Sequence, residues 1–262
     1  MSKFHLANRG LVCMAAFGVA AAGLGGAALA TPVTILNPSF ETVAAGEPTD
    51  GNYSLAPHVN TNSIAGTYNG TFNSWGYVET GGSAFQDFGI ENPSASEYTG
   101  ATGSGTPSGA NGTNVAFLNQ AITGGVCYIF QDVGALQADT TYTLTVAIGQ
   151  RLDRTNGSVD IGLINAGSGQ TNPWANGTIL SSTTGVSSVA GTFQDFTATF
   201  TTGGTVTGDL FVGAQYVGNG TVQGSVDNFR LNAASVSVPE PTSLGLLGLG
   251  TAGMLLRRRR NA

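Results

Sequence analysis

The sequence of 262 residues is poor in the residue types on which many catalytic and metal sites depend. It has two cysteines, Cys13 and Cys127, and two histidines, His5 and His58. One cysteine after residue 30 excludes an internal disulfide in that region, and one histidine excludes a histidine-rich zinc site. Cys127 lies in an apolar run, which is typical of a buried and unreactive thiol.

Positive charge is also scarce. Between residues 31 and 237 only Arg151, Arg154 and Arg230 are basic and 14 residues are acidic, so the net charge there is 3 − 14 = −11. Nucleic-acid binding needs clustered Lys and Arg, so we expect no nucleic-acid partner. Arg151 and Arg154 flank Asp153, a pattern typical of a solvated charge cluster. The many carboxylates suit a hard cation such as Ca²⁺.

No catalytic motif is recognisable. The chain lacks a Gly-x-Ser-x-Gly elbow and a phosphate-binding loop followed by Lys. A glycosidase needs only two well-placed carboxylates, and Glu91 with Glu97, or Asp153 with Asp160, flank loops. Nothing singles out either pair. The sequence therefore predicts no catalytic residues and a protein that is not an enzyme.

The N-terminus carries an export pattern. Lys3 and Arg9 precede an uncharged, mostly apolar run, and Ala28-Leu29-Ala30 has the small-x-small spacing of a signal peptidase site. Residues 1–30 are therefore predicted to be a signal peptide, with signal peptidase as a partner. An uncleaved transmembrane helix is the alternative, which the Ala- and Gly-rich composition disfavours. Residues 31–237 have the length of a single domain with a proper core.

Residues 238–262 form a second targeting pattern: a Pro-Glu-Pro spacer, an uncharged run at 244–256, and four arginines. The run has 13 residues, whereas a comfortable transmembrane helix needs roughly 20, and the arginines favour the cytoplasmic side. The residues of the motif are Pro239, Glu240, Pro241, Arg257, Arg258, Arg259 and Arg260.

This order of features resembles the PEP-CTERM sorting signal of Gram-negative bacteria. The resemblance implies cleavage by an exosortase near the Pro-Glu-Pro, after the C-terminal hydrophobic helix has entered the inner membrane transiently. It also implies delivery of the domain to the cell envelope, the cell surface or the extracellular matrix. An ordinary C-terminal tail anchor is the alternative reading.

The central region alternates in hydrophobicity with a period of two, which predicts short β-strands. Residues 141–148 and 193–200 show the pattern, and strands at 208–217 and 221–231 flank a Gly-Asn-Gly hairpin signal. Frequent turn residues favour an all-β antiparallel sandwich or barrel. The Gly-, Ser- and Thr-rich stretch 100–114 is predicted to be a mobile surface loop or an insertion.

Two motifs near the ends of this region resemble the galactose-binding-like jelly-roll superfamily, which includes carbohydrate-binding modules. They are Asn-Pro-Ser-Phe-Glu at 37–41 and Val-Asp-Asn-Phe-Arg-Leu at 226–231. The resemblance implies an antiparallel jelly-roll β-sandwich in which Glu41 and Asp227 bind a structural Ca²⁺, a role that suits carboxylate oxygens. The alternative is that these carboxylates accept backbone N–H groups or meet Arg230.

A lectin-like site would stack sugars on exposed aromatic rings. Trp174, Tyr53 and Tyr98 lie among polar loop residues and are the candidates, whereas Trp75 is expected in the core. We therefore expect an exported surface or matrix protein that binds glycan, such as extracellular polysaccharide, without catalysis. A secreted glycoside-active enzyme and a purely structural surface protein are the alternatives.

Overall fold

The period-two alternation produces two long paired strands. In the computed structural model, strand β7 (Thr140–Gln150) buries Tyr142, Leu144 and Val146, while the threonines between them are more exposed. Strand β10 (Thr192–Thr201) pairs antiparallel with β7 along its whole length without a shift in register. Strands are thus present in both places where the alternation predicts them.

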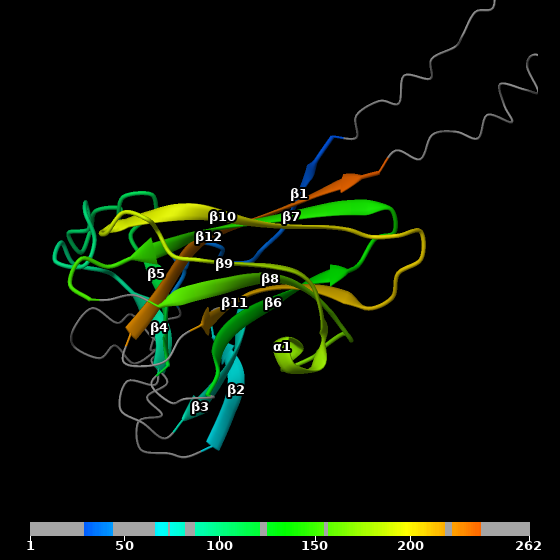
Figure 1. Ribbon diagram of the computed structural model, residues 1–262, viewed down its shortest axis with the longest axis horizontal. Helices are drawn as coiled ribbons and strands as arrows, with labels where there is room; N and C mark the ends of the chain where they lie inside the picture. The colour runs from blue at the N-terminus through cyan, green and yellow to red at the C-terminus, as the bar shows by residue number, and fades with distance from the viewer. Residues whose placement is uncertain are drawn as a thin grey trace, which may run out of the picture. The chain divides into compact units, whose positions relative to one another are not determined.

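These strands belong to one of two antiparallel sheets that pack as a sandwich (Figure 1). Sheet A runs in the order β10, β7, β12 (Val222–Ser235), β5 (Val115–Gln120) and β4 (Asp87–Glu91), and β1 (Thr31–Val33) pairs with β12. Sheet B runs in the order β2 (Gly66–Phe72), β3 (Trp75–Gly81), β6 (Cys127–Ala135), β11 (Asp209–Val217), β8 (Ser158–Ala166) and β9 (Thr178–Gly185). The predicted all-β jelly-roll fold is confirmed.

The hairpin predicted for residues 208–217 and 221–231 is wrong. Strands form there, as β11 and β12, but they lie in different sheets. β11 pairs with β6 and β8, and β12 pairs with β7 and β5. Turn residues permit the chain to reverse, but they do not select the strand with which it then pairs.

Three aromatic rings close one end of the core. The Trp75 ring lies 5.4 Å from that of Phe40 and 4.6 Å from that of Phe229, measured between ring centroids. The buried Trp75 indole N–H donates to the Asn37 carbonyl at 3.1 Å. Phe40 and Phe229 come from the two motifs that suggested the jelly roll, so the resemblance corresponds to a packing contact, and Trp75 is a core residue as expected.

The stretch 100–114 is a surface loop that is attached to sheet A by a few buried side chains in it and beside it. Tyr98 and Ala101 are fully buried and form a small apolar cluster with Val115 and Phe193. Positive φ angles at four glycines let the chain turn sharply between these contacts; they are Gly100, Gly103, Gly109 and Gly112. A surface loop is present here, as predicted, and its predicted mobility stays a prediction.

The structure describes residues 29–43, 66–72, 74–81, 87–120, 125–154, 157–217 and 222–236. Ala28–Val236 forms one compact unit. Within the described ranges, no helix has the length and apolar character needed to cross a membrane. The predicted signal peptide, the C-terminal hydrophobic helix and Tyr53 all lie outside these ranges and stay predictions.

Candidate functional site

One end of the inner face of sheet B carries polar side chains between apolar ones. Glu79 on β3 lies directly opposite Cys127 on β6. The register of β11 against β6 brings Tyr216 to the level of Cys127. The exposed fractions of Glu79, Cys127 and Tyr216 are 0%, 0% and 1%. A carboxyl, a thiol and a phenol therefore form one row between the sheets, and Cys127 is buried as expected.

An aromatic pair lies beside Glu79. Tyr77 precedes Glu79 by two residues on β3, so the two side chains share a face. The Tyr77 ring stacks on Phe88 of sheet A, with centroids 4.2 Å apart and planes inclined by 33°. Burial, and then the charge of Glu79, raise the pKa of the Tyr77 phenol. Tyr77 is only half-buried, whereas Glu79 beside it is fully buried.

Burial of a carboxyl is costly and needs a compensating reason, which makes Glu79 a functional candidate. A carboxyl in this position can give or take a proton where little water competes. The adjacent rings can pack against an apolar ring or face a developing cation. Sequence analysis missed Glu79. The available signal was the alternation Trp75-Gly76-Tyr77-Val78-Glu79, which puts the carboxyl on the face of two aromatic residues.

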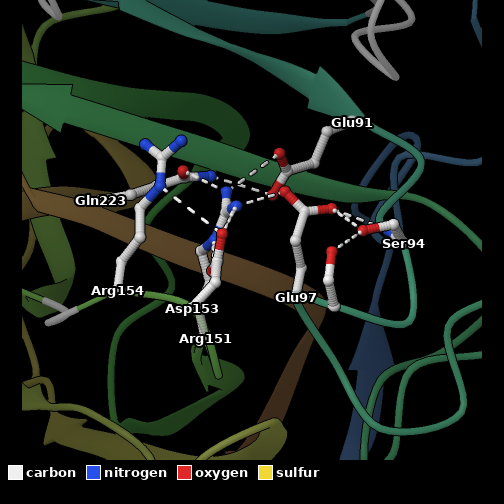
Figure 2. Close-up of polar contacts among 8 residues, drawn as sticks. Glu91, Ser94, Glu97, Arg151, Asp153, Arg154 and Gln223 are labelled. Carbon is white, nitrogen blue, oxygen red and sulfur yellow. Dashed lines mark hydrogen bonds and ion pairs between the residues drawn. The ribbon is translucent and has the colours of Figure 1, made fainter.

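A second polar cluster lies on the outer face of sheet A, where three carboxyl groups surround the Arg151 guanidinium (Figure 2). Arg151 is 4% exposed. Its Nε and Nη2 donate to Asp153 Oδ1 and Oδ2 at 2.9 Å each. Its Nη2 also pairs with Glu97, and its Nη1 lies 3.7 Å from Glu91 Oε2. The prediction of a solvated cluster is wrong for Arg151, because residues distant in sequence enclose it.

Gln223 of β12 links Glu91 to Arg151. Its Nε2 donates to Glu91 Oε1 at 2.9 Å, and its Oε1 accepts from Arg151 Nη1 at 2.6 Å. Burial raises the pKa of Glu91 from 4.5 to about 8, although the charge of Arg151 opposes the rise. The hydrogen bonds from Arg151 lower the pKa of Asp153. Burial thus favours the neutral form of Glu91, whereas Arg151 favours the ionised form of Asp153.

The two residues predicted to bind calcium meet at the loop 111–114. The Asn111 N–H donates to Asp227 Oδ2 at 2.5 Å. The Thr113 and Asn114 N–H groups donate to Glu41 Oε1 at 2.9 and 2.8 Å. The structure thus brings Glu41 and Asp227 to neighbouring positions, and each carboxylate accepts backbone N–H groups, as the alternative reading expected.

Asp227 retains an unsatisfied oxygen. It is fully buried, and its Oδ1 finds no hydrogen-bond partner among the described residues. Burial raises the pKa of Asp227 to about 8, against the hydrogen bond from Asn111, and the charge of Glu41 adds to the rise. Arg230 does not compensate by contact, since it pairs with Asp195 at 2.5 Å.

The surroundings of Asp227 and Glu41 are compatible with calcium but not with a metal that needs several charged ligands. Within the described ranges, no three His, Cys, Asp or Glu side chains converge on one point. A cation here would use two carboxylates together with carbonyl, hydroxyl or amide oxygens, a ligand set that Ca²⁺ accepts. The unpartnered Asp227 Oδ1 is the atom that most favours such an ion.

Trp174 does not offer an exposed ring. It lies in the one-turn helix α1 (Pro173–Asn176), is 8% exposed, and packs against Tyr128 with ring centroids 6.2 Å apart. The indole lies close to Gly162 and Gly213 of sheet B, where an added Cβ would clash with it. The expectation of an exposed Trp174 is wrong, because packing against glycine positions on the sheet covers an aromatic residue in a polar stretch.

Tyr98 is also buried, with an exposed fraction of 0%. Its ring stacks on Phe193, with centroids 4.8 Å apart. Tyr53, the third aromatic candidate, lies outside the described residues. The two described candidates therefore serve packing, and neither presents a platform for a sugar ring.

Comparison with known families decides the relationship of the chain. The model described as HpiC1 cyclase matches residues 31–232, which is more than half of the chain. The chain belongs to the HpiC1-like cyclase family. A PEP-CTERM protein-sorting motif matches residues 237–260. Among curated protein sequences, none matches the chain.

Several solved structures share the fold. The apo form of a cyclase from Fischerella sp. aligns with a TM-score of 0.53 at 20% identity, over 80% of this chain and 98% of that one. A Stig cyclase, Fisc, from Fischerella sp. TAU was solved in complex with (3Z)-3-(1-methyl-2-pyrrolidinylidene)-3H-indole. It aligns with a TM-score of 0.50 at 19% identity, over 79% of this chain and 99% of that one.

The family match corrects one prediction and confirms another. The prediction that the protein is not an enzyme is wrong, because the domain is of the cyclase type. Catalysis does not require a recognisable motif, so the absence of motifs did not exclude an enzyme. The PEP-CTERM prediction is confirmed. The motif makes exosortase the processing partner and directs export to the cell envelope or surface of a Gram-negative bacterium, although its residues from Pro239 to Arg260 lie outside the described ranges.

Proposed function

We propose that the exported domain is an enzyme that cyclises or rearranges a small, largely apolar, ring-bearing substrate, and that Glu79 transfers the proton. The observation that carries the proposal is the fully buried Glu79 carboxyl on the inner face, next to the half-buried Tyr77 ring. Membership of the cyclase family supports the reaction class, and the indole ligand of the Fischerella relative supports a ring-bearing substrate.

The chemistry follows from the groups present. Proton transfer from the Glu79 carboxyl to a substrate π bond breaks the O–H bond, forms a C–H bond and leaves a carbocation on the substrate. The rings of Tyr77 and Phe88 face that positive charge, and the low-polarity interior strengthens its attraction to the carboxylate. Closure of the ring and loss of a proton back to Glu79 then restore the acid, so the product is an isomer of the substrate.

The test is a search for isomerisation by the exported, processed protein. Indole-bearing alkenes are incubated with the protein, and liquid chromatography with mass spectrometry detects products of unchanged mass. We expect Glu79→Gln to abolish the product and Asp132→Asn, a change of an exposed carboxylate on β6, to leave the rate unaltered. Equal rates for the wild type and Glu79→Gln would refute the role of Glu79. Absence of any isomer across the substrate set would count against the reaction class.

We also propose a structural Ca²⁺ at Glu41 and Asp227. Two observations support it. The Oδ1 atom of Asp227 has no hydrogen-bond partner within the described part of the chain, and both carboxylates bond to the same loop, 111–114. The ion would join the N-terminal and C-terminal motifs to that loop, and it would supply positive charge rather than take part in the reaction.

Glycan binding stays a prediction. The jelly-roll fold permits it, but the burial of Trp174 and Tyr98 means that it needs another surface. Retention of the protein on immobilised extracellular polysaccharide, unchanged in Trp174→Phe, is the measurement that would support such a surface.

A further inference from the structure

Residues 92–114, here called the strap, cross the outer face of sheet A between two carboxyl-containing anchors. Near its start, Glu97 pairs with Arg151. Near its end, the Asn111 N–H bonds to Asp227. The strap is thus tied to the sheet at both ends by interactions that depend on charge.

The middle of the strap is held by one aromatic stack and by backbone hydrogen bonds. Tyr98 stacks on Phe193 of the edge strand β10. The Thr99 N–H donates to the Gly191 carbonyl at 2.9 Å, and the Phe193 N–H of β10 donates to the Ser108 carbonyl at 2.8 Å. These two amides report on whether the strap is closed, because their hydrogen bonds join the strap to residues 191–193 at the edge of sheet A.

The charges around Arg151 balance only while Glu91 is neutral. Arg151 pairs with the Glu97 and Asp153 carboxylates, and Arg154 Nε lies 3.8 Å from Asp153 Oδ2. Two positive and two negative charges then cancel. Ionisation of Glu91, which is 8% exposed, would add a third negative charge inside the protein.

The remaining groups that face this cluster do not supply a compensating charge. Gln223 and Ser225 on β12 are neutral, and burial raises the pKa of Tyr98, which keeps its phenol protonated. Burial also raises the pKa of Glu91 from its ordinary value of 4.5 to about 8 in the closed protein. Lifting of the strap would return Glu91 to water and towards its ordinary pKa.

We infer that the Arg151 cluster is a clasp that fastens the strap over sheet A, and that ionisation of Glu91 releases it. Below about pH 4.5 Glu91 is protonated in both the closed and the open form, so its proton no longer makes closure depend on pH. Between about 4.5 and about 8 only the closed form keeps the proton, and closure weakens steadily as pH rises. Opening uncovers Ser225 and Asp227, which are fully buried in the closed form.

Hydrogen exchange on the full chain tests the clasp. Exchange at the Thr99 and Phe193 amides is measured between about pH 5 and about pH 9 and divided by the intrinsic rate at each pH. The opening constant should rise by up to tenfold per pH unit and level off near pH 8. Glu91→Gln keeps the shape of the side chain and its contact with Gln223 but cannot ionise, so its corrected exchange should rise less steeply with pH than that of the wild type. The remaining rise belongs to Asp227, whose pKa burial also raises to about 8 and which opening uncovers.

Two further variants keep the inference falsifiable if Glu91→Gln proves unstable. In Glu97→Gln, Glu91 becomes the second counter-ion of the arginines, so the rise should level off at lower pH. Asp195→Asn, which removes an exposed carboxylate paired with Arg230, should behave as the wild type. Corrected exchange in the wild type that is independent of pH, or a rise with pH in Glu91→Gln that is as steep as in the wild type, would overturn the inference.

Discussion

Calcium should stabilise the protein in a manner that depends on the proton of Asp227. The rise in its pKa from 3.8 to about 8 corresponds to about 4 units, or on the order of 5 kcal/mol against the ionised form in the closed, ion-free site. A bound Ca²⁺ requires the ionised form. The ion must therefore displace the proton, and its apparent affinity should rise about tenfold per pH unit up to about pH 8.

The expected size of the effect follows from mass action. Calcium at about 100 times its dissociation constant stabilises the native state by about 2.7 kcal/mol. For a domain of this length, that corresponds to a rise in Tm of about 5–10 °C. Differential scanning calorimetry with calcium or with chelator, at about pH 6 and about pH 9, measures both the rise and its pH dependence.

The controls separate this site from the rest of the protein. In Asp227→Asn, one ligand charge is lost, and the calcium-dependent part of Tm should disappear. Asp195→Asn removes a carboxylate of the same charge at an exposed position and should keep the full response. A Tm at about pH 9 that is the same in calcium and in chelator would refute the calcium site and the reading of the buried Asp227 Oδ1 as a ligand.

The other predictions concern packing and surface charge, and urea unfolding measures each of them. Trp174→Ala should lower the free energy of unfolding by about 3–5 kcal/mol, since it empties a buried position over sheet B; a change below 1 kcal/mol would mean that the ring is exposed after all. Gly224→Val should cost about 1–3 kcal/mol, because even its Cβ would lie 2.6 Å from Val159 Cγ2 and 3.3 Å from Tyr216 Cδ2. Wild-type stability in that variant would contradict the close approach of the two sheets there. Arg230→Ala should change stability by less than about 1 kcal/mol, as expected for an exposed ion pair, and a larger loss would indicate a buried role.

Local sequence patterns were sufficient to predict several strands and the export of the protein. A period of two in residues 141–148 reports which side chains face the core, because that period is a property of the extended backbone itself. The order of features in residues 238–262 likewise needs no folding to be recognised. The two end motifs indicated the jelly roll, and their residues Phe40 and Phe229 do meet, with ring centroids 6.0 Å apart.

The burial of individual aromatic rings and the choice of strand partners could not be predicted from the sequence. Trp174 and Tyr98 sit in polar stretches, and only the sheet surfaces beneath them explain why their rings are covered. β11 and β12 are adjacent in sequence, yet each finds its partners elsewhere, because partner choice follows the packing of two sheets rather than the turn.

By itself, the sequence determined an exported, acidic, all-β domain with a sorting signal, because alternation, net charge and targeting patterns are local properties of the chain. Only the tertiary structure brought Phe88 of sheet A onto the Tyr77 ring, and Glu91 and Glu97 around Arg151. The sequence around a carboxylate does not reveal which groups will surround it in the folded protein. Its chemistry is decided by the dielectric and by the charges that folding brings to it from distant segments.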